Sequence, residues 1–473
     1  PVLRVGGGTY FNRMAPGGLK PDGTPENPSD ASEFHVWRVD RNWTTKSVQR
    51  RSASYRAGLS NPADASAGQV AQARDQYEYD WNNWPADRGA PYQECNGEPG
   101  FQTSTATAEA VAQGASCRTE SGGPNLEGDI PGVPGAAQTL WTVANDIGFP
   151  GTSGEDAVEF EFGSPAIGLE VQYTLWAYAR PPGDPLGNIN FINSKIIYTG
   201  KPDSHPNPTP DDAEIDSFFT SWWVDPDVGS NGNDYAGSNP ERDLVYSYNS
   251  SPQDVSYEQI GLPPPAVGFD MLKGAVVDPT TREPLPSGVP GDTLKSSALN
   301  YFAAGAEFTD PALFSYDGTL QWFNLMRGVR PQPGYPSEVP FRDPQGNTAD
   351  FLLTGDPVTG TGWIDGQLLP ASDRRIVNTS GPVNNFEVGD TLDVTVAQVK
   401  ALGTGFLSSI ARMRFFDDAA QFAFNQDFEL PSPPSTPEVT ATGLDERVVL
   451  EWGTSRSTVT QIEEEYSSPP GFE

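Results

Sequence analysis

Cysteine and histidine are almost absent from this chain of 473 residues, which has two of each. Two histidines, His35 and His205, cannot build a histidine-based metal centre, and a Ser-His-Asp catalytic site would depend on one of them. Cys95 and Cys117 have no histidine nearby and therefore cannot form a structural zinc site. We expect a disulfide between these cysteines if the protein is extracellular, and two unpaired buried thiols otherwise.

Positive charge is also scarce. The chain has 63 acidic and 29 basic residues, a formal net charge of -34, and only seven of the basic residues are lysines. Binding to nucleic acid needs a basic face that releases counterions, so we expect no nucleic-acid partner, and anionic membrane surfaces are disfavoured for the same reason. The excess of carboxylates suits a salty marine or halophilic environment that screens their repulsion, although an ordinary secreted acidic protein has a similar composition.

Long apolar runs are missing as well. No stretch approaches the ~18 consecutive apolar residues that indicate a membrane-spanning helix, so we expect no membrane insertion. The first residue is Pro1, and no signal peptide is visible. We therefore expect that a leader was removed or that the chain is a fragment of a longer polypeptide.

Glycine and proline, in contrast, are abundant, with 49 and 46 residues. This much turn chemistry argues against a helical bundle, and an aromatic content of 11% is too high for a disordered acidic chain. The composition predicts a mainly β fold, built from β-sandwich modules with long Gly/Pro-rich loops. The expected strands are residues 34–39, 157–162, 167–178, 189–198, 218–224, 244–248, 319–325 and 392–396.

Two segments are expected to be helical. Residues 60–80 are rich in alanine and glutamine and predict a short helix. Residues 404–427 predict one amphipathic helix, because apolar residues recur there at three- and four-residue steps and Pro431 follows. The apolar positions, which we expect to pack against the core, are Phe406, Ile410, Met413, Phe416, Ala420 and Phe424.

The predicted domain organisation has four parts. Residues 1–155 form a loop-rich N-terminal region that holds an aromatic segment and the expected disulfide, and residues 156–430 form a β-sandwich region with an acidic loop and the C-terminal helix. Residues 431–437 are a Pro-rich linker. The following residues, 438–473, resemble the first two strands of a fibronectin type III domain, with Trp452 at the position of its core tryptophan. Because such a domain needs ~100 residues, we expect it to be incomplete here.

A dense aromatic segment lies at residues 77–85. Tyr79, Trp81 and Trp84 could form a platform on which sugar rings stack, and a glycan would then be a ligand. The alternative, which we favour, is that these aromatic side chains are buried in a core.

An acidic, glycine-containing segment follows the strand-like residues 218–224. Its oxygen-bearing side chains at short spacing predict a site for a hard cation, Ca²⁺, and no Lys or Arg between Lys201 and Arg242 relieves their repulsion. The alternative is an acidic turn whose side chains bond only to their own backbone. The predicted ligands are Asp225, Asp227, Asn233 and Asp234, with Asp243 farther along the chain.

Catalytic motifs are not visible. The sequence has no GxSxG, HExxH or GxxxxGK[ST] pattern and no GxGxxG between a strand and a helix. A glycosidase needs only two carboxylates at a defined separation, but 63 acidic residues offer no basis for choosing a pair. We therefore expect no enzymatic activity and name no catalytic residue.

The acidic segment also carries a family resemblance. The segment Asp225-Pro226-Asp227-Val228-Gly229 follows a tryptophan pair and precedes an Asp-Tyr-Ala-Gly segment and a Tyr-Asn pair. This arrangement resembles a region of large secreted proteins of the Bacteroidota and related marine bacteria, which are exported by the type IX system. Two positions depart from the family pattern: Asn233 replaces an aspartate and Ser238 replaces a frequent cysteine. Shorter matches lie at residues 80–86, 129–132, 167–170, 316–322, 355–362, 373–375 and 381–382.

The resemblance implies location and architecture more than activity. It implies a surface or released protein with β-sandwich modules, fibronectin-like repeats and a sorting domain farther along. Proteins of this phylum are often O-glycosylated at Asp-Ser/Thr-aliphatic sites, which makes Thr293 and Thr391 the matching positions.

We therefore expect a non-enzymatic extracellular structural or adhesive surface protein, such as a subunit of a surface assembly or filament. Its partners would be other copies of itself or other surface proteins. One alternative is the glycan-binding ancillary part of a secreted polysaccharide-degrading enzyme, with a polysaccharide as the partner. The second alternative is a virion structural protein of a halophilic host, because acidity and β structure suit it equally.

Overall fold

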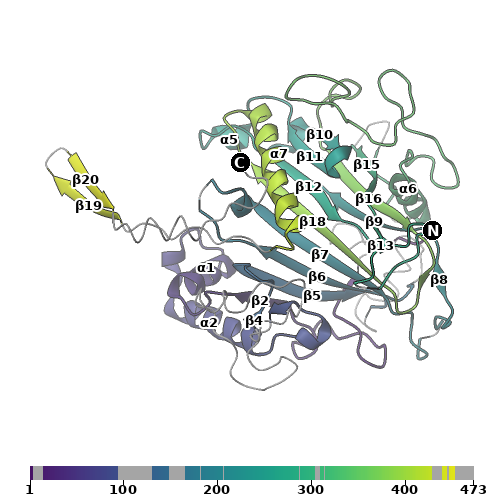
Figure 1. Ribbon diagram of the computed structural model, residues 1–473, viewed down its shortest axis with the longest axis horizontal. Helices are drawn as coiled ribbons and strands as arrows, with labels where there is room; N and C mark the ends of the chain where they lie inside the picture. Colours follow the sequence, from purple (N-terminus) through teal and green to yellow (C-terminus); the bar gives the residue numbers. More distant parts are fainter. Residues whose placement is uncertain are drawn as a thin grey trace.

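The computed structural model of the protein describes residues 1–3, 14–93, 130–148, 166–181, 183–205, 207–286, 288–303, 309–313, 315–428, 439–444 and 447–452. The described residues are mainly β, in antiparallel sheets, as the composition predicts (Figure 1). Cys95, Cys117 and the expected strand 157–162 lie outside the described residues.

One large antiparallel sheet organises the fold. Its strands follow the order β1-β5-β6-β7-β18-β12-β11-β10, and β2 also pairs with β5. Because β5 and β6 pair directly, the expected division between residues 155 and 156 falls inside this sheet. The strands are β1 (Ala15–Pro16), β2 (Trp37–Asp40), β5 (Gln138–Asn145), β6 (Leu169–Ala177), β7 (Ile189–Tyr198), β10 (Asp234–Asn239), β11 (Leu244–Asn249), β12 (Ala266–Lys273) and β18 (Thr391–Ala401).

The burial of each strand follows from what covers it. Every second residue of β5 is buried, including Trp141 and Val143, which is the period of a half-covered strand. All six residues of β11 are buried, because this strand lies between a second sheet and a helix. Central strands covered on both faces consist of nearly continuous apolar residues.

The second sheet has three strands and packs on one face of the large sheet. It contains β15 (Ser296–Phe302), β16 (Arg375–Val383) and β9 (Phe218–Val224), in that order. Leu299 and Val377 of this sheet share one buried cluster with Phe269 and Val396 of the large sheet. The two sheets form a sandwich of unequal halves.

Smaller strand pairs flank the sandwich. They are β8 (Glu214–Ile215) with β17 (Phe386–Glu387), β13 (Val276–Val277) with β14 (Asp292–Thr293), and β3 (Tyr92–Gln93) with β4 (Ile130–Pro131).

Helix α7 (Phe406–Asn425) covers the opposite face of the large sheet (Figure 1). It contacts β12, β18 and β11. Ile410, Met413, Phe416 and Ala420 are buried against these strands, which confirms the predicted amphipathic helix. Phe406 and Phe424 are only half-buried.

The other helices lie at the edges of the sandwich. Helix α2 (Ala67–Asn82) confirms most of the predicted helix, and Ser66 and Gln69 form its capping box. Helix α1 (Lys46–Arg56) packs against α2 and was not expected. Two short 3-10 segments follow these helices in the chain, η1 (Pro62–Asp64) and η2 (Ala86–Arg88). A third, η3 (Pro185–Asn188), contacts α7 and β18.

The expected strand 319–325 is wrong, because these residues belong to helix α6 (Tyr316–Met326). Thr319, Trp322 and Leu325 are buried, and their three-residue spacing is that of one helix face. High β-propensity of the aromatic and β-branched residues concealed this period, and tertiary packing decided the state.

A hairpin ends the described chain. Strands β19 (Val439–Leu444) and β20 (Arg447–Trp452) pair with each other and with no other strand of the described residues. A fibronectin type III-like domain from residue 438 onward stays a prediction. None of the described helices has the length and apolar character needed to cross a bilayer.

Candidate functional site

The acidic segment predicted to bind a cation connects a strand of the small sheet to a strand of the large sheet. Strand β9 of the small sheet ends at Val224, and strand β10 of the large sheet begins at Asp234. Because β9 pairs antiparallel with β16, with Val224 opposite Ile376, the residues just before β16 lie beside those just after β9. The pairing therefore brings Asp373 next to the acidic loop.

Three carboxylates meet at this point. One oxygen from each of Asp225, Asp227 and Asp373 lies within 4.8 Å of the other two. The structure thus brings two predicted ligands together with a third residue that the sequence analysis missed. No sequence signal pairs Asp373 with the loop, because the pairing depends on the register of two strands far apart in the chain.

One cation of the protein partly balances this cluster. Arg375 Nη2 lies 2.7 Å from Asp373 Oδ2, and Arg375 Nε lies 3.3 Å from Asp225 Oδ2. No Lys or Arg lies between Lys201 and Arg242, and β16 supplies Arg375 from outside the loop instead. Burial raises the pKa of Asp225 and Arg375 lowers it, whereas the charges of Asp373 and Asp227 raise it further.

Asp234, a buried carboxylate, lies near these three but is not one of the residues whose oxygens lie within 4.8 Å of one another. Its side chain is 1% exposed, and its Oδ2 accepts a hydrogen bond from the Val228 N–H at 3.3 Å. Its Oδ1 is buried and has no donor among the described residues. Burial raises the pKa of Asp234 to about 7, although the hydrogen bond from the Val228 N–H lowers it. The negative charges of Asp227 and Asp373 add to the rise. A buried oxygen without a donor is costly, and a cation would satisfy it.

Asp254 holds the loop in shape. It precedes helix α5 (Val255–Glu258) and is 2% exposed. Its carboxylate accepts hydrogen bonds from the N–H of Ser230 and of Ser256, both at 2.9 Å, and from Asn233 Nδ2 at 3.2 Å. The amide nitrogen of Asn233 thus anchors the loop, while its buried Oδ1 has no donor within the part of the chain that the structure describes.

Asp243 is not part of this site, which corrects the fifth predicted ligand. It caps the 3-10 turn η5 (Pro240–Arg242) between β10 and β11. In the hairpin register Asp234 pairs with Asn249 at one end, and the turn lies at the other. Asp243 Oδ1 accepts a hydrogen bond from the Ser296 N–H at 2.8 Å. The whole length of β10 therefore separates Asp243 from the cluster.

The predicted glycan platform is also corrected. Trp81 and Trp84 are 6% and 0% exposed and belong to a buried cluster beneath the N-terminal strands. Trp84 Nε1 donates to the carbonyl of Pro91 at 2.7 Å. Tyr79 is exposed on the opposite side of α2 and stacks on Trp37, with ring centroids 5.9 Å apart. The favoured alternative, burial in a core, is confirmed for both tryptophans.

The two predicted glycosylation sites differ in accessibility. Thr293 is exposed in β14. Thr391 is half-buried at the first position of β18, where it pairs with Ile197. Both assignments stay predictions.

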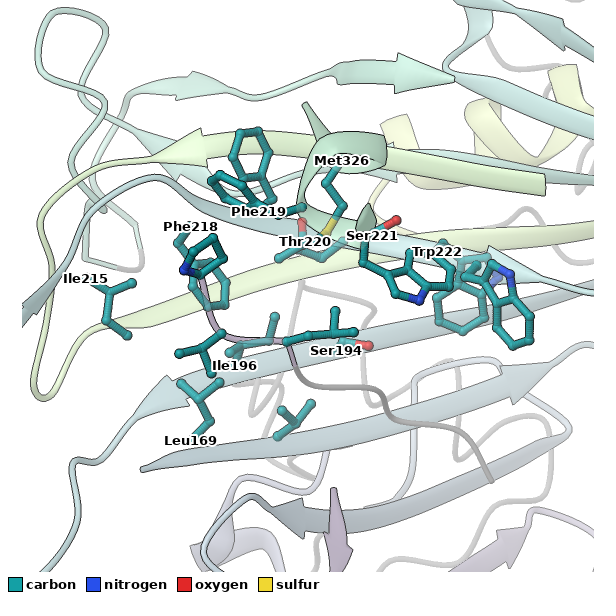
Figure 2. Close-up of a pocket in the computed structure, with 18 of the residues that line it drawn as sticks. Leu169, Ser194, Ile196, Ile215, Phe218, Phe219, Thr220, Ser221, Trp222 and Met326 are labelled. Atoms are coloured by element: carbon teal, nitrogen blue, oxygen red, sulfur yellow. The ribbon is translucent and has the colours of Figure 1, made fainter. Parts of the chain in front are cut away.

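An apolar groove, which the sequence analysis missed, lies between the sheets beside β9 (Figure 2). It has a volume of about 780 Å³. Leu169, Ser194 and Ile196 form its floor, while Phe219 and Met326 lie above them (Figure 2). Residues from β6, β7, β9, β18 and α6 contribute, and these strands are joined only by the tertiary fold.

No protein-family model matches the chain, and no curated protein matches it.

Proposed function

We propose that the protein is a non-enzymatic extracellular structural module of a surface protein, and that Ca²⁺ bound at the acidic cluster joins its two sheets. The observations that carry the proposal are the carboxylates of Asp225, Asp227 and Asp373, whose oxygens lie within 4.8 Å of one another, and the nearby Asp234. The Oδ1 of Asp234 is buried and has no donor among the described residues, and the charges of Asp227 and Asp373 act on it. Arg375 pairs with both Asp225 and Asp373 and lies 3.8 Å from Asp310 as well, so the carboxylates at this point outnumber its single positive charge.

The chemistry of the donors favours calcium. Ca²⁺ binds six to eight oxygen atoms at ~2.3–2.6 Å in flexible geometry, from carboxylates, carbonyls and water. The cluster offers carboxylates of different exposure on two separate segments, which suits an adaptable coordination shell. Mg²⁺ demands nearly ideal octahedral geometry and gives up its water reluctantly. We therefore infer a calcium site in preference to a magnesium site.

The position of the cluster supports a structural role. Asp225 follows β9 and Asp373 precedes β16, both in the small sheet. Asp234 is the first residue of β10, in the large sheet. An ion held by all three would tie the two halves of the sandwich at one end.

We infer an extracellular location, because a calcium site there would be filled even if it bound weakly. Sites in extracellular modules commonly bind with dissociation constants on the order of 10⁻⁴–10⁻³ M, so they fill only where calcium is abundant. The partner remains, in this proposal, another copy of the protein or another surface protein. The glycan-binding alternative loses support, because Trp81 and Trp84 are buried.

Thermal unfolding with and without calcium tests the proposal. The chain is treated with a chelator, and its melting temperature is measured in 10 mM CaCl₂, in 10 mM MgCl₂ and in NaCl of equal ionic strength. For a dissociation constant near 1 mM, calcium would stabilise the fold by about 1.4 kcal/mol. Asp373→Asn should abolish the calcium response.

Asp243→Asn serves as the control variant and should keep the calcium response. A wild-type melting temperature that is equal in all three salts would overturn the proposal. So would a response that survives Asp373→Asn but disappears in Asp243→Asn, because the ion would then lie at the turn between β10 and β11.

A further inference from the structure

We propose that copies of this chain associate head to tail: a basic face of helix α1 on one copy docks on the acidic strand pair β8–β17 of the next copy. The inference rests on the proposed structural role, because it takes another copy of the chain as the partner, but it does not depend on the calcium site. Two surfaces of opposite charge on opposite sides of the molecule carry it.

Helix α1 supplies the basic surface. Four of its 11 residues are basic and none is acidic, although the whole chain has only 29 basic residues. All four are exposed, and none of their side chains forms an ion pair or a hydrogen bond with another described residue. This basic face consists of Lys46, Arg50, Arg51 and Arg56.

The carboxylates beneath α1 do not neutralise the basic face. Asp40 and Asp80 are 9% and 1% exposed and are therefore covered by protein. They act on Arg51 and Arg56 through their charge and not through a direct contact. Asp80 already has a partner, because its Oδ1 lies 2.7 Å from His35 Nε2. The exposed cations thus remain available to an acidic partner.

The strand pair β8–β17 supplies the acidic surface. Its register places Glu214 directly opposite Glu387, and both residues are exposed. Like charges directly opposite each other in an antiparallel pair repel, because the two side chains lie on the same face. Neither glutamate forms an ion pair with another described residue, and Asp211 and Asp212 are exposed just before β8. A cation from another molecule would relieve this repulsion.

The two surfaces lie on opposite sides of the sandwich, with α1 at the left of Figure 1 and β8 at the right. A contact between them therefore joins two copies, and each copy keeps one surface of each kind free for the next. Such a heterologous contact builds a ring or an open filament. The net charge of -34 does not prevent it, because at physiological ionic strength charges act only over ~8 Å.

Sedimentation velocity of the complete chain tests the inference, with a chelator present so that calcium plays no part. In about 0.05 M NaCl we expect the sedimentation coefficient to rise with protein concentration, and in about 1 M NaCl to return to that of the monomer. General repulsion between acidic copies predicts the opposite, because salt would then favour association. Reversing the basic face, by Arg50→Glu with Arg51→Glu, should weaken association at least tenfold. Reversing the acidic pair, by Glu214→Lys with Glu387→Lys, should do the same.

An equimolar mixture of these two charge-reversed variants should associate again, because each reversed surface then meets a surface of opposite charge. Their association in the mixture also shows that both variants are folded. The matched control is Lys295→Glu with Arg342→Glu, which changes the net charge as much as reversal of the basic face does, at two other exposed positions. The control should associate like the wild type.

The inference is overturned if the wild type stays a monomer at every protein concentration, if salt promotes its association, or if the mixture does not associate. Loss of association in the control would overturn it as well. A monomeric wild type that binds a sulfated polysaccharide through Arg50 and Arg51 would overturn it and assign the basic face to an anionic glycan. None of these results changes the melting-temperature response to calcium, so the two proposals fail separately.

Discussion

Arg375 Nε lies 3.3 Å from Asp225 Oδ2, although 150 residues separate them. The contact results from the antiparallel pairing of β9 and β16, in which Val224 lies opposite Ile376. The same register places Asp373 at the acidic loop and makes the cluster a property of the sandwich. Any function of the loop therefore depends on correct pairing within the small sheet.

Terbium luminescence should report the cluster directly. Tb³⁺ is a hard cation that replaces Ca²⁺ at oxygen sites, and Trp222 and Trp223 immediately precede the loop. We expect Tb³⁺ emission excited through tryptophan, and competition by millimolar calcium. Asp227→Asn should reduce the emission several-fold, whereas Asp64→Asn, in the exposed turn η1, should leave it unchanged. Equal emission from both variants would contradict the assignment.

Gly229→Ala should destabilise the loop. Gly229 has a φ of +87°, and a Cβ there would lie 2.4 Å from Asp254 Oδ1. The left-handed backbone and the close contact together should cost about 2 kcal/mol or more in the free energy of unfolding. Gly232→Ala is the control in the same loop, because no heavy atom lies within 4 Å of its added Cβ. Urea unfolding compares the two, and equal losses of stability would show that Asp254 does not restrict the loop.

Stability should fall as the pH rises above 4, because of two buried carboxyl groups between β12 and α7. Burial raises the pKa of Asp417 to about 6, and burial together with the charge of Asp417 raises the pKa of Asp270 well above its usual value. The folded state therefore holds protons that the unfolded chain loses near pH 4. For Asp417 this stabilisation is complete below pH 4 and is lost as the pH rises through 6, by about 2–3 kcal/mol.

Asp270→Asn should flatten this pH dependence and raise stability at pH 8 relative to the wild type. Asp418→Asn is the control, because Asp418 pairs with the same Arg242 but is exposed. Chemical denaturation at pH 4, 6 and 8 provides the measurement. A wild-type free energy of unfolding that increases steadily from pH 4 to pH 8 would be inconsistent with a buried, protonated pair.

Trp84→Ala should act on stability and not on glycan binding. The side chain is completely buried and its indole N–H bonds to the Pro91 carbonyl, so we expect a loss of about 3–5 kcal/mol in the free energy of unfolding. Tyr79→Ala, at an exposed position, should change stability little. Affinity electrophoresis with marine polysaccharides checks binding. Retardation of the wild type that Tyr79→Ala removes would revive the glycan-binding alternative.

Local patterns were sufficient for some elements. The three- and four-residue spacing of Ile410, Met413 and Phe416 identified α7, and the run from Asp225 to Asp234 identified the acidic loop. Both depend on neighbours in the chain, because helix periodicity and loop composition are local properties. The same kind of reasoning failed for α6, where residues with high β-propensity occupy a helix.

The sequence by itself therefore determined a mainly β, strongly acidic protein with one long amphipathic helix and an oxygen-rich loop. Only the tertiary structure decided which acidic groups meet: it brought Asp373 and Arg375 to the loop and removed Asp243 from it. It alone also created the apolar groove between β9 and the strands β6 and β7. The physical reason is that strand pairing joins segments far apart in the chain, and its register is set by the packing of both sheets.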